Sequence, residues 1–96
     1  MTNYYIITYD IEEDRDRNKI MKILKDYGNR LQYSVYQCNL DEKNLMALVK
    51  KLQKRLRSQN DSIIVFKLCN RCYSEIRMYG SKKEILSKDE DDVVII

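Results

Sequence analysis

The sequence predicts a single α+β domain, a ferredoxin-like sandwich in which two helices cover one face of an antiparallel sheet. Three observations support this fold class. Short apolar stretches typical of strands alternate with two segments of helical periodicity, in the order strand, helix, strands, helix, strand, strand. The length of 96 residues suits one domain. With two glycines and no proline, the sequence shows no flexible linker that would separate two domains.

The first strand is predicted over residues 4–11, where β-branched and aromatic residues dominate. Apolar side chains on both of its faces indicate a central strand that is covered on each side. A helix is predicted over 14–27, because its apolar residues recur with the spacing of one helical face. These residues are Ile20, Ile23, Leu24 and Tyr27. Gly28 is the expected C-terminal stop of this helix.

The middle of the chain is predicted to contain extended structure and a second helix. Residues 30–40 are either one bent strand or two short strands folded near Gln32–Ser34. The second helix is expected over about 42–57, because leucines and a valine form an apolar stripe there. Asp41 is its candidate N-cap.

The last third of the chain is predicted to complete the sheet. A largely apolar, buried strand is expected at 62–68, followed by a turn at 69–72 and by an alternating strand at 73–79. We therefore expect a ferredoxin-like domain over 1–80 and a C-terminal tail over 81–96. The four aliphatic residues that end the tail would be buried as a short edge strand, in a sheet of the same chain or of a partner.

Basic residues are concentrated in the middle of the chain. Residues 15–57 hold twelve lysines and arginines and four acidic residues, a net charge of +8 in a chain whose total net charge is +3. This distribution fits a nucleic-acid surface, although two solvated helix faces explain it equally well. No apolar run approaches the roughly 20 residues that span a membrane, and no signal peptide is visible. We therefore expect a cytoplasmic protein.

Asp10 ends the first strand and is a candidate ligand for Mg²⁺ or Mn²⁺, which prefer carboxylate oxygens. The alternative is a capping box with Glu13 at the start of the first helix. One carboxylate per chain is a weak metal site, and a two-fold axis that brings two Asp10 side chains together would improve it. The sequence has no histidine, so a phosphodiesterase would depend on a metal-bound water. Tyr9, whose ordinary pKa is about 10, is expected to orient groups rather than act as a base.

Three basic residues stand at the start of the first helix. Arg15, Arg17 and Lys19 are candidate phosphate contacts, because cations there oppose the helix dipole and folding alone would not select them. Tyr33 and Tyr36 could stack on bases, although tyrosines on a half-buried strand more often pack against neighbours.

Cys69 and Cys72 form a C-x-x-C motif. A zinc site would need two more ligands, and Cys38 is the one remaining cysteine. A redox role would require the motif at the start of a helix in a βαβ unit, whereas here it is expected between two strands. We therefore interpret the pair as reduced cysteines at a turn.

Several segments, in order over nearly the whole chain, resemble the CRISPR-associated (Cas) family two, the small partner of the CRISPR adaptation integrase. These segments are Tyr9-Asp10-Ile11, Glu13-Asp14-Arg15-Asp16-Arg17-Asn18-Lys19, Tyr27-Gly28, Gln32-Tyr33-Ser34-Val35-Tyr36, Leu68-Cys69-x-x-Cys72 and Asp91-Asp92-Val93-Val94-Ile95-Ile96. The sequence departs from the family pattern in two places. The family often has two basic residues where Asp16 and Arg17 stand, and it often has Phe where Tyr36 stands.

The resemblance implies a ferredoxin-like homodimer whose C-terminal strand joins the sheet of the other subunit. It implies that two Asp10 carboxylates face each other across the two-fold axis and bind Mg²⁺ or Mn²⁺. It also implies metal-dependent endonuclease activity on RNA or double-stranded DNA, with Asp10, Tyr9 and Ser34 as the catalytic candidates. The candidate nucleic-acid contacts are Arg15, Arg17, Lys19, Arg30 and Tyr36.

In the cell, the resemblance implies a role in spacer acquisition, in which the protein bridges two integrase dimers so that a DNA fragment lies across the assembly. Two alternatives remain. One is a structural DNA-binding adaptor without catalysis, and the other is a toxin-like ribonuclease of the VapD group, which shares the fold.

Overall fold

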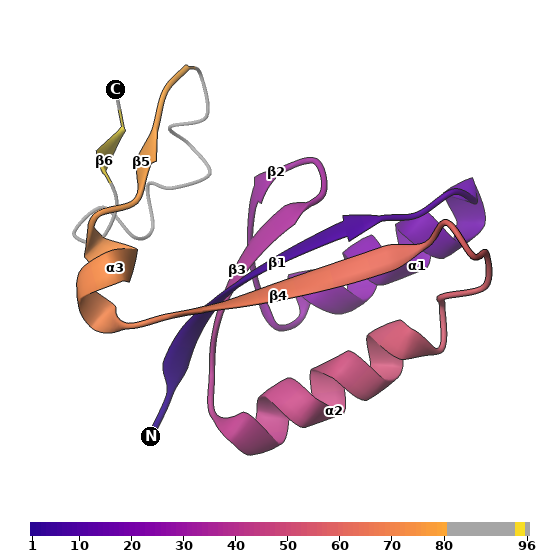
Figure 1. The fold of residues 1–96 in the computed structure, drawn as a ribbon, viewed down its shortest axis with the longest axis horizontal. Helices are drawn as coiled ribbons and strands as arrows, with labels where there is room; N and C mark the ends of the chain where they lie inside the picture. Colours follow the sequence, from indigo (N-terminus) through magenta and orange to yellow (C-terminus); the bar gives the residue numbers. More distant parts are fainter. Residues whose placement is uncertain (81–93, 96) are drawn as a thin grey trace.

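The computed structural model describes residues 1–80 and 94–95, in which helices pack on a β-sheet (Figure 1). The elements are β1 Asn3–Asp10, α1 Asp14–Lys25, β2 Gly28–Gln32, β3 Val35–Leu40, α2 Glu42–Gln53, β4 Ser62–Leu68, α3 Asn70–Ser74, β5 Arg77–Met78 and β6 Val94–Ile95. From β1 to β4 the order is the one that the sequence predicts, with the extended middle segment taking the form of two strands.

Four strands form one antiparallel sheet in the order β2-β3-β1-β4, so β1 is a central strand as predicted. The connection through α1 links β1 to β2 with β3 between them. The connection through α2 links β3 to β4 with β1 between them. This interleaved arrangement is that of the ferredoxin-like fold, which confirms the predicted fold class. The pairing of β2 with β3 shifts between Arg30 and Gln32, where the hairpin begins to turn.

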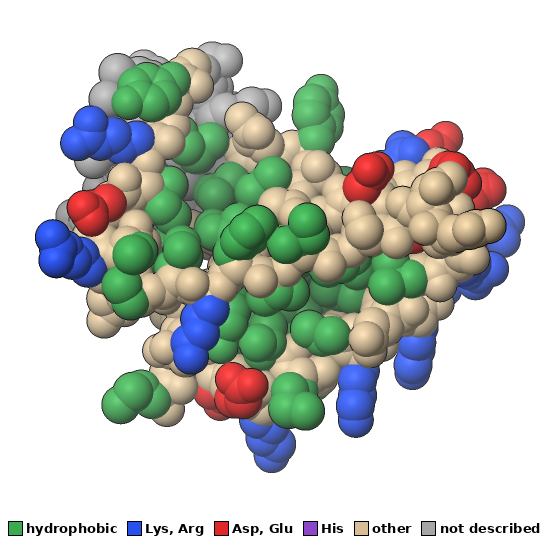
Figure 2. All heavy atoms as spheres, in the orientation of Figure 1, with side chains coloured by type: hydrophobic (Ala, Val, Ile, Leu, Met, Phe, Trp, Pro, Cys, Tyr) green, Lys and Arg blue, Asp and Glu red, His purple; other side chains and the backbone are tan. Residues whose placement is uncertain are grey.

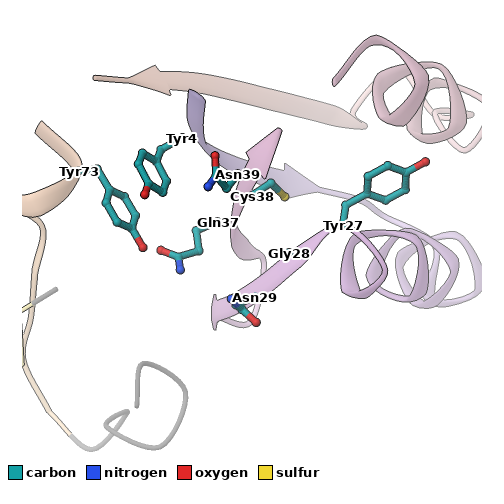
Figure 3. A pocket seen from close by; sticks show the side chains of 8 residues that line it. All are labelled: Tyr4, Tyr27, Gly28, Asn29, Gln37, Cys38, Asn39 and Tyr73. Carbon is teal, nitrogen blue, oxygen red and sulfur yellow. The ribbon is translucent and has the colours of Figure 1, made fainter. Parts of the chain in front are cut away.

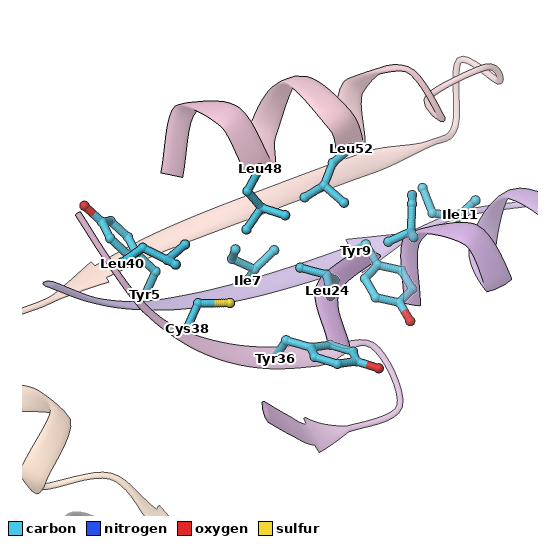
Figure 4. Close-up of a cluster of buried hydrophobic side chains, with 11 residues drawn as sticks. Tyr5, Ile7, Tyr9, Ile11, Leu24, Tyr36, Cys38, Leu40, Leu48 and Leu52 are labelled. Atoms are coloured by element: carbon cyan, nitrogen blue, oxygen red, sulfur yellow. The ribbon is translucent and has the colours of Figure 1, made fainter. Parts of the chain in front are cut away.

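The main core lies between the sheet and the two long helices (Figure 4). Alternate residues of β1 point to this side, because side chains of a strand alternate between its two faces. The buried residues are Tyr5, Ile7, Tyr9, Ile11, Ile20, Leu24, Tyr36, Cys38, Leu40, Leu48 and Leu52. Each fully buried aliphatic side chain contributes about 1.5–3 kcal/mol relative to exposure. Asp41 caps α2 as predicted, accepting a hydrogen bond of 2.8 Å from the backbone N–H of Asn44.

Gly28 does not end α1, contrary to the prediction. The helix ends at Lys25 with Asp26 as its C-cap, and Gly28 is the first residue of β2. The backbone of Gly28 approaches β3 so closely that a Cβ atom would collide with the carbonyl oxygen of Gln37 and would lie 2.7 Å from Cys38 Sγ. A close approach of two strands, rather than helix termination, therefore requires a glycine here.

β4 is an edge strand, and the prediction that it is buried is wrong. Ile64, Val65 and Phe66 are exposed by 51%, 36% and 50%. Apolar composition alone does not distinguish a strand covered by its own chain from one that is left open. Figure 2 shows hydrophobic side chains along the middle of the molecule, where Figure 1 places β4.

The predicted turn at 69–72 and strand at 73–79 are also wrong. Cys69 caps the short helix α3, and within 73–79 the strand is reduced to Arg77–Met78. The ring of Tyr73 is 2% exposed and stacks on Tyr4, with ring centroids 3.8 Å apart and planes 4° apart. Tyr4 alternates with the core residue Tyr5, so α3 brings Tyr73 onto the face of the sheet opposite α1 and α2.

The C-terminal strand β6 pairs with β5 in parallel, with Arg77 opposite Val94 and Met78 opposite Ile95. The division of the chain after residue 80 and the pairing of the tail with a partner subunit stay predictions. Residues 81–93 and 96 of the predicted tail lie outside the described residues. Among the described residues, no helix is long and apolar enough to cross a membrane.

Candidate metal and nucleic-acid site

Asp10 is the last residue of β1, opposite Ser62 of β4, and its side chain is exposed. It lies on the face of the sheet opposite α1 and α2, because the preceding residue, Tyr9, belongs to the core. Asp10 does not cap α1: the N-cap is Glu13, which makes no side-chain capping hydrogen bond. The capping-box alternative is therefore wrong, and the carboxylate is directed to solvent.

The carboxylate stands beside a partly exposed apolar surface. Paired residues of antiparallel strands share a face, and Ile6 stands opposite Phe66 while Thr8 stands opposite Ile64. We call Ile6, Thr8, Asp10, Ile64 and Phe66 the open sheet face. Since Ile64 and Phe66 are each about half exposed, Asp10 marks the polar end of an apolar surface.

Arg17 holds the loop that follows β1. Its Nε donates to the carbonyl oxygen of Ile11 at 3.2 Å, and its Nη2 donates to that of Glu12 at 3.2 Å. Its Nη1 pairs with the carboxylate of Asp14 at 2.7 Å. The expectation that folding does not select a cation here is wrong for Arg17, because these acceptors offset its unfavourable place in the helix dipole. Arg17 is a positioning residue for the loop after Asp10.

A second set of contacts ties this loop to the segment before β4. Asp61 accepts hydrogen bonds from the backbone N–H groups of Glu12 at 2.9 Å and of Arg57 and Ser58 at 3.0 Å each. The carboxylate of Glu12 accepts from Ser58 Oγ and from Asn60 Nδ2 at 2.9 Å each. We call these five residues the loop latch. The backbone donors, that of Glu12 first, lower the pKa of Asp61 below its usual value.

Sequence reasoning missed the loop latch. It assigned no role in the site to Glu12 or to Asp61. The bond between them spans 49 residues, and no local pattern pairs residues so far apart. The available signal was the Ser58-x-Asn60-Asp61 segment before β4, because such side chains commonly hydrogen-bond to nearby backbone groups.

Asp16 has a structural role. It is 3% exposed, and its Oδ1 lies 3.5 Å from Nε of Arg57. Removal of one partner of such a pair leaves an uncompensated buried charge, which is strongly destabilising. Arg57 therefore serves the fold through both Asp16 and the loop latch.

Tyr9 and Ser34 lie next to each other through a contact between their backbones. The backbone N–H of Tyr9 donates to the carbonyl oxygen of Ser34 at 3.1 Å, and the Tyr9 hydroxyl donates to that of Tyr33 at 3.2 Å. Burial raises the pKa of Tyr9 above its ordinary value, while the charges of Arg30 and Arg17 lower it by less. A hydroxyl held in this way positions the hairpin against the end of β1 and is a poor base.

Tyr36 is buried in this fold, whereas the predicted contact with nucleic acid needs an exposed ring. Its side chain is 0% exposed, and its ring lies within the core with its centroid 6.4 Å from that of Tyr9. Burial raises the pKa of Tyr36, and the neighbouring Tyr9 adds to the effect. A base could reach this ring only after the core had opened.

The remaining basic candidates do not gather in one place. Arg15 is exposed and borders a hollow together with Arg57. Lys19 is half-buried on α1. The guanidinium of Arg30 lies over the ring of Tyr33, 5.1 Å from its centroid, and Tyr33 is 79% exposed. Tyr33 is therefore the tyrosine of this hairpin that is placed to stack on a base.

The donor chemistry at Asp10 fits one ligand of a hard divalent ion. Mg²⁺ commonly binds through one or two carboxylates and keeps several waters, which an exposed Asp10 permits. Within 1–80 and 94–95, no group of three or more histidine, cysteine or acidic side chains is arranged to hold a metal.

A polar cavity of about 220 Å³ lies at the other end of the sheet from Asp10 (Figure 3). Its lining residues are Tyr4, Tyr27, Gly28, Asn29, Gln37, Cys38, Asn39 and Tyr73. None of the predicted site residues is among them. The cavity and the predicted site are therefore distinct features of the molecule.

Comparisons with known proteins agree with this fold. The family model described as CRISPR associated protein Cas2 matches residues 1–76. A protein named CRISPR-associated endoribonuclease Cas2 3, from Synechocystis sp., is 34% identical over 91 residues, which cover 95% of this chain and 97% of that protein.

Two solved structures extend the comparison. A crystal structure described as cas2 has a TM-score of 0.72 at 26% identity, covering 86% of this chain and 92% of that chain. A chain of a partial Cas6-RT-Cas1–Cas2 complex has a TM-score of 0.60 at 23% identity, covering 74% and 83%, and supports the fold alone. Because the family model spans most of the chain and the Synechocystis relative matches nearly all of it, the chain belongs to the Cas2 family of CRISPR-associated proteins.

Proposed function

We propose that this chain is a spacer-acquisition protein of CRISPR adaptation, which acts as a homodimer and binds RNA or double-stranded DNA. It hydrolyses phosphodiester bonds with Mg²⁺ or Mn²⁺ held at Asp10. The observation that carries this proposal is the exposed carboxylate of Asp10 on the open sheet face. The naming of the Synechocystis relative as an endoribonuclease supports the same chemistry.

The open sheet face supports the homodimer. Ile64 and Phe66 are half exposed, and a domain this small gains stability when such a surface is covered. A two-fold axis beside this face would bury the surface of both copies and bring the second Asp10 near the first. β4 ends the four-stranded sheet, so its outer edge offers backbone groups to the predicted C-terminal strand of a partner.

The protein's own residues hold the Asp10 carboxylate in place. Arg17 and the loop latch fix the loop that follows it, and Tyr9 fixes the end of β1 against Ser34. When bound at Asp10, Mg²⁺ or Mn²⁺ supplies a Lewis acid for the phosphodiester and lowers the pKa of water. The positioning of the carboxylate in advance limits the reorganisation that the reaction requires.

The nuclease proposal is tested with single-stranded RNA and duplex DNA, each incubated with Mg²⁺, with Mn²⁺ and with EDTA. We expect cleavage that requires the metal and that falls about a hundredfold or more in Asp10→Ala, since loss of the metal removes several kcal/mol of stabilisation. Asp26→Ala removes another exposed carboxylate, at the far end of α1, and keeps the wild-type rate. Equal cleavage by the wild type and Asp10→Ala would exclude Asp10 as the ligand.

A second function, a structural adaptor without catalysis, is favoured by the lack of a complete metal-ligand group within the described residues. Exposed basic residues of α2 offer a surface for a nucleic-acid backbone. These residues are Lys43, Lys50 and Lys51. The expected partner is a CRISPR integrase subunit, as membership of the Cas2 family implies. Either function is compatible with the expected cytoplasmic location.

The adaptor function is tested by measuring the affinity for duplex DNA against salt concentration. We expect the logarithm of the affinity to fall linearly with that of the salt concentration, with a slope of about −0.9 for each phosphate contact. Lys50→Ala should reduce the slope by about one such contact, whereas Asp10→Ala should leave it unchanged. Affinity that does not depend on salt would exclude this surface.

A further inference from the structure

The C-x-x-C motif lies at the start of the short helix α3, where the sequence predicts a turn between two strands. Cys69 is the N-cap of α3, and the backbone N–H of Cys72 donates to Cys69 Sγ at 3.3 Å. Both cysteines are exposed, whereas Cys38 is buried in the core. Tyr73 of this helix is 2% exposed and stacks on Tyr4.

The two thiols are not equivalent. Hydrogen bonds from the backbone N–H and then from the thiol of Cys72 lower the pKa of Cys69, because they stabilise its thiolate. The same contact with Cys69, followed by its charge, raises the pKa of Cys72. Burial raises the pKa of Cys38 to about 11. An exposed thiol with a lowered pKa beside a second exposed thiol has the properties of a nucleophile and its resolving partner.

We propose that Cys69 and Cys72 form a reversible intrachain disulfide by exchange with a small-molecule disulfide such as oxidised glutathione. The Cys69 thiolate attacks one sulfur of glutathione disulfide, a mixed disulfide forms, and one glutathione thiolate leaves. The Cys72 thiolate then attacks the Cys69 sulfur, and the second glutathione leaves. The protein dithiol loses two electrons and two protons, and glutathione disulfide takes them up as two thiols. This inference does not depend on the proposed function.

The alternative chemistry for two such cysteines is a zinc site. Structural zinc sites take four ligands, and within the described residues no third histidine, cysteine or acidic side chain joins this pair. Arg71 and Glu75, the charged residues of this turn, pair with each other at 3.9 Å. The described geometry therefore favours thiol chemistry over metal binding.

The disulfide would close the first turn of α3, directly beside Tyr73. That ring packs on Tyr4 and on the buried Leu31 of the sheet. The backbone then continues into β5, which pairs with β6. Oxidation would therefore stiffen the connection between the four-stranded sheet and the C-terminal strand pair.

The test equilibrates the full chain with mixtures of reduced and oxidised glutathione at neutral pH, quenches with acid, alkylates and maps peptides by mass spectrometry. We expect a 69–72 intrachain disulfide whose fraction rises with the oxidised share and returns to zero with dithiothreitol. Cys38, as internal control, should be alkylated after denaturation. Cys72→Ser should accumulate a glutathione adduct on Cys69, faster than Cys69→Ser accumulates one on Cys72.

Two further outcomes decide against the proposal. The proposal is overturned if Cys69 and Cys72 stay reduced at every ratio of reduced to oxidised glutathione. It is also overturned if their disulfides form only between chains. A second measurement compares amide hydrogen exchange of residues 72–76 in the two redox states. Slower exchange after oxidation supports the closed turn, and unchanged exchange refutes the stiffening of the connection.

Discussion

Replacement of Phe66 by alanine tests whether the open sheet face is the surface that joins two copies of the chain. Phe66 is 50% exposed and stands opposite Ile6, on the face that carries Asp10. A phenylalanine buries roughly 200 Å² in full, so about 100 Å² remains to be covered by a partner. At about 25 cal/mol per Å², this area is worth about 2.5 kcal/mol in each copy, of which alanine keeps a part.

A symmetric dimer loses this contribution twice, about 4 kcal/mol if the whole area is converted into affinity. The dissociation constant of the dimer should then rise by about a thousandfold at most. It should rise by about tenfold if only a small part of the buried area contributes to affinity. Sedimentation equilibrium over a wide range of protein concentration measures it. Because Phe66 is half exposed in the single chain, the circular dichroism of the variant should stay that of the folded protein.

Met46→Ala is the matched control for Phe66→Ala. Met46 is 57% exposed on α2, which packs against the other face of the sheet. The dissociation constant of this variant should stay within about twofold of the wild type. If Phe66→Ala stays folded and also leaves the dissociation constant unchanged, the open sheet face is not the dimer contact. The proposal that two Asp10 carboxylates lie close together would then be wrong.

Three further predictions concern the stability of the fold. Gly28→Ala should lower the free energy of unfolding by about 1–3 kcal/mol, because its methyl group would collide with the Gln37 carbonyl; urea titration measures this. Asp61→Asn should flatten the dependence of stability on pH. The backbone donors, led by Glu12, lower the folded pKa of Asp61, so its contribution is present above the unfolded value of 3.8 and is lost as the pH falls through the folded value. Acid titration of the melting temperature of both proteins would show this, and identical curves would contradict it. Asp41→Ala should cost about 1 kcal/mol through loss of the α2 cap, and Asp41→Asn should restore most of it in the same urea assay.

Local patterns in the sequence were enough to predict most of the sheet and both long helices. The alternation of apolar residues, the helical spacing and the Asp41 cap act over fewer than ten residues, and each reports on its own neighbourhood. The prediction for the region after 68 is wrong: Tyr73 of α3 stacks on Tyr4, which is distant in the sequence, and no local pattern indicates this contact. The role of Gly28 was missed for the same reason, since it is set by the approach of another strand.

The candidate site divides in the same way. The exposure of Asp10 at the end of β1 followed from a strand whose last residue is acidic. The role of Arg17 could not be predicted from the sequence, because a charge pattern alone does not show that a guanidinium will donate to two backbone carbonyl groups. The sequence leaves both stacking and packing open for Tyr36, and in the structure its side chain is buried in the core.

The loop latch has a consequence for how the protein responds to heat. Asp10 ends a central strand, and the chain immediately beyond it is bonded to the beginning of the edge strand β4. Local unfolding of the C-terminal end of β1 would break contacts to two separate parts of the chain at once. It should therefore be rare below the melting transition. Any activity that depends on Asp10 should then be lost at the same temperature as the global fold. Protein refolded after heating should recover the loop geometry around Asp10 without a separate slow step.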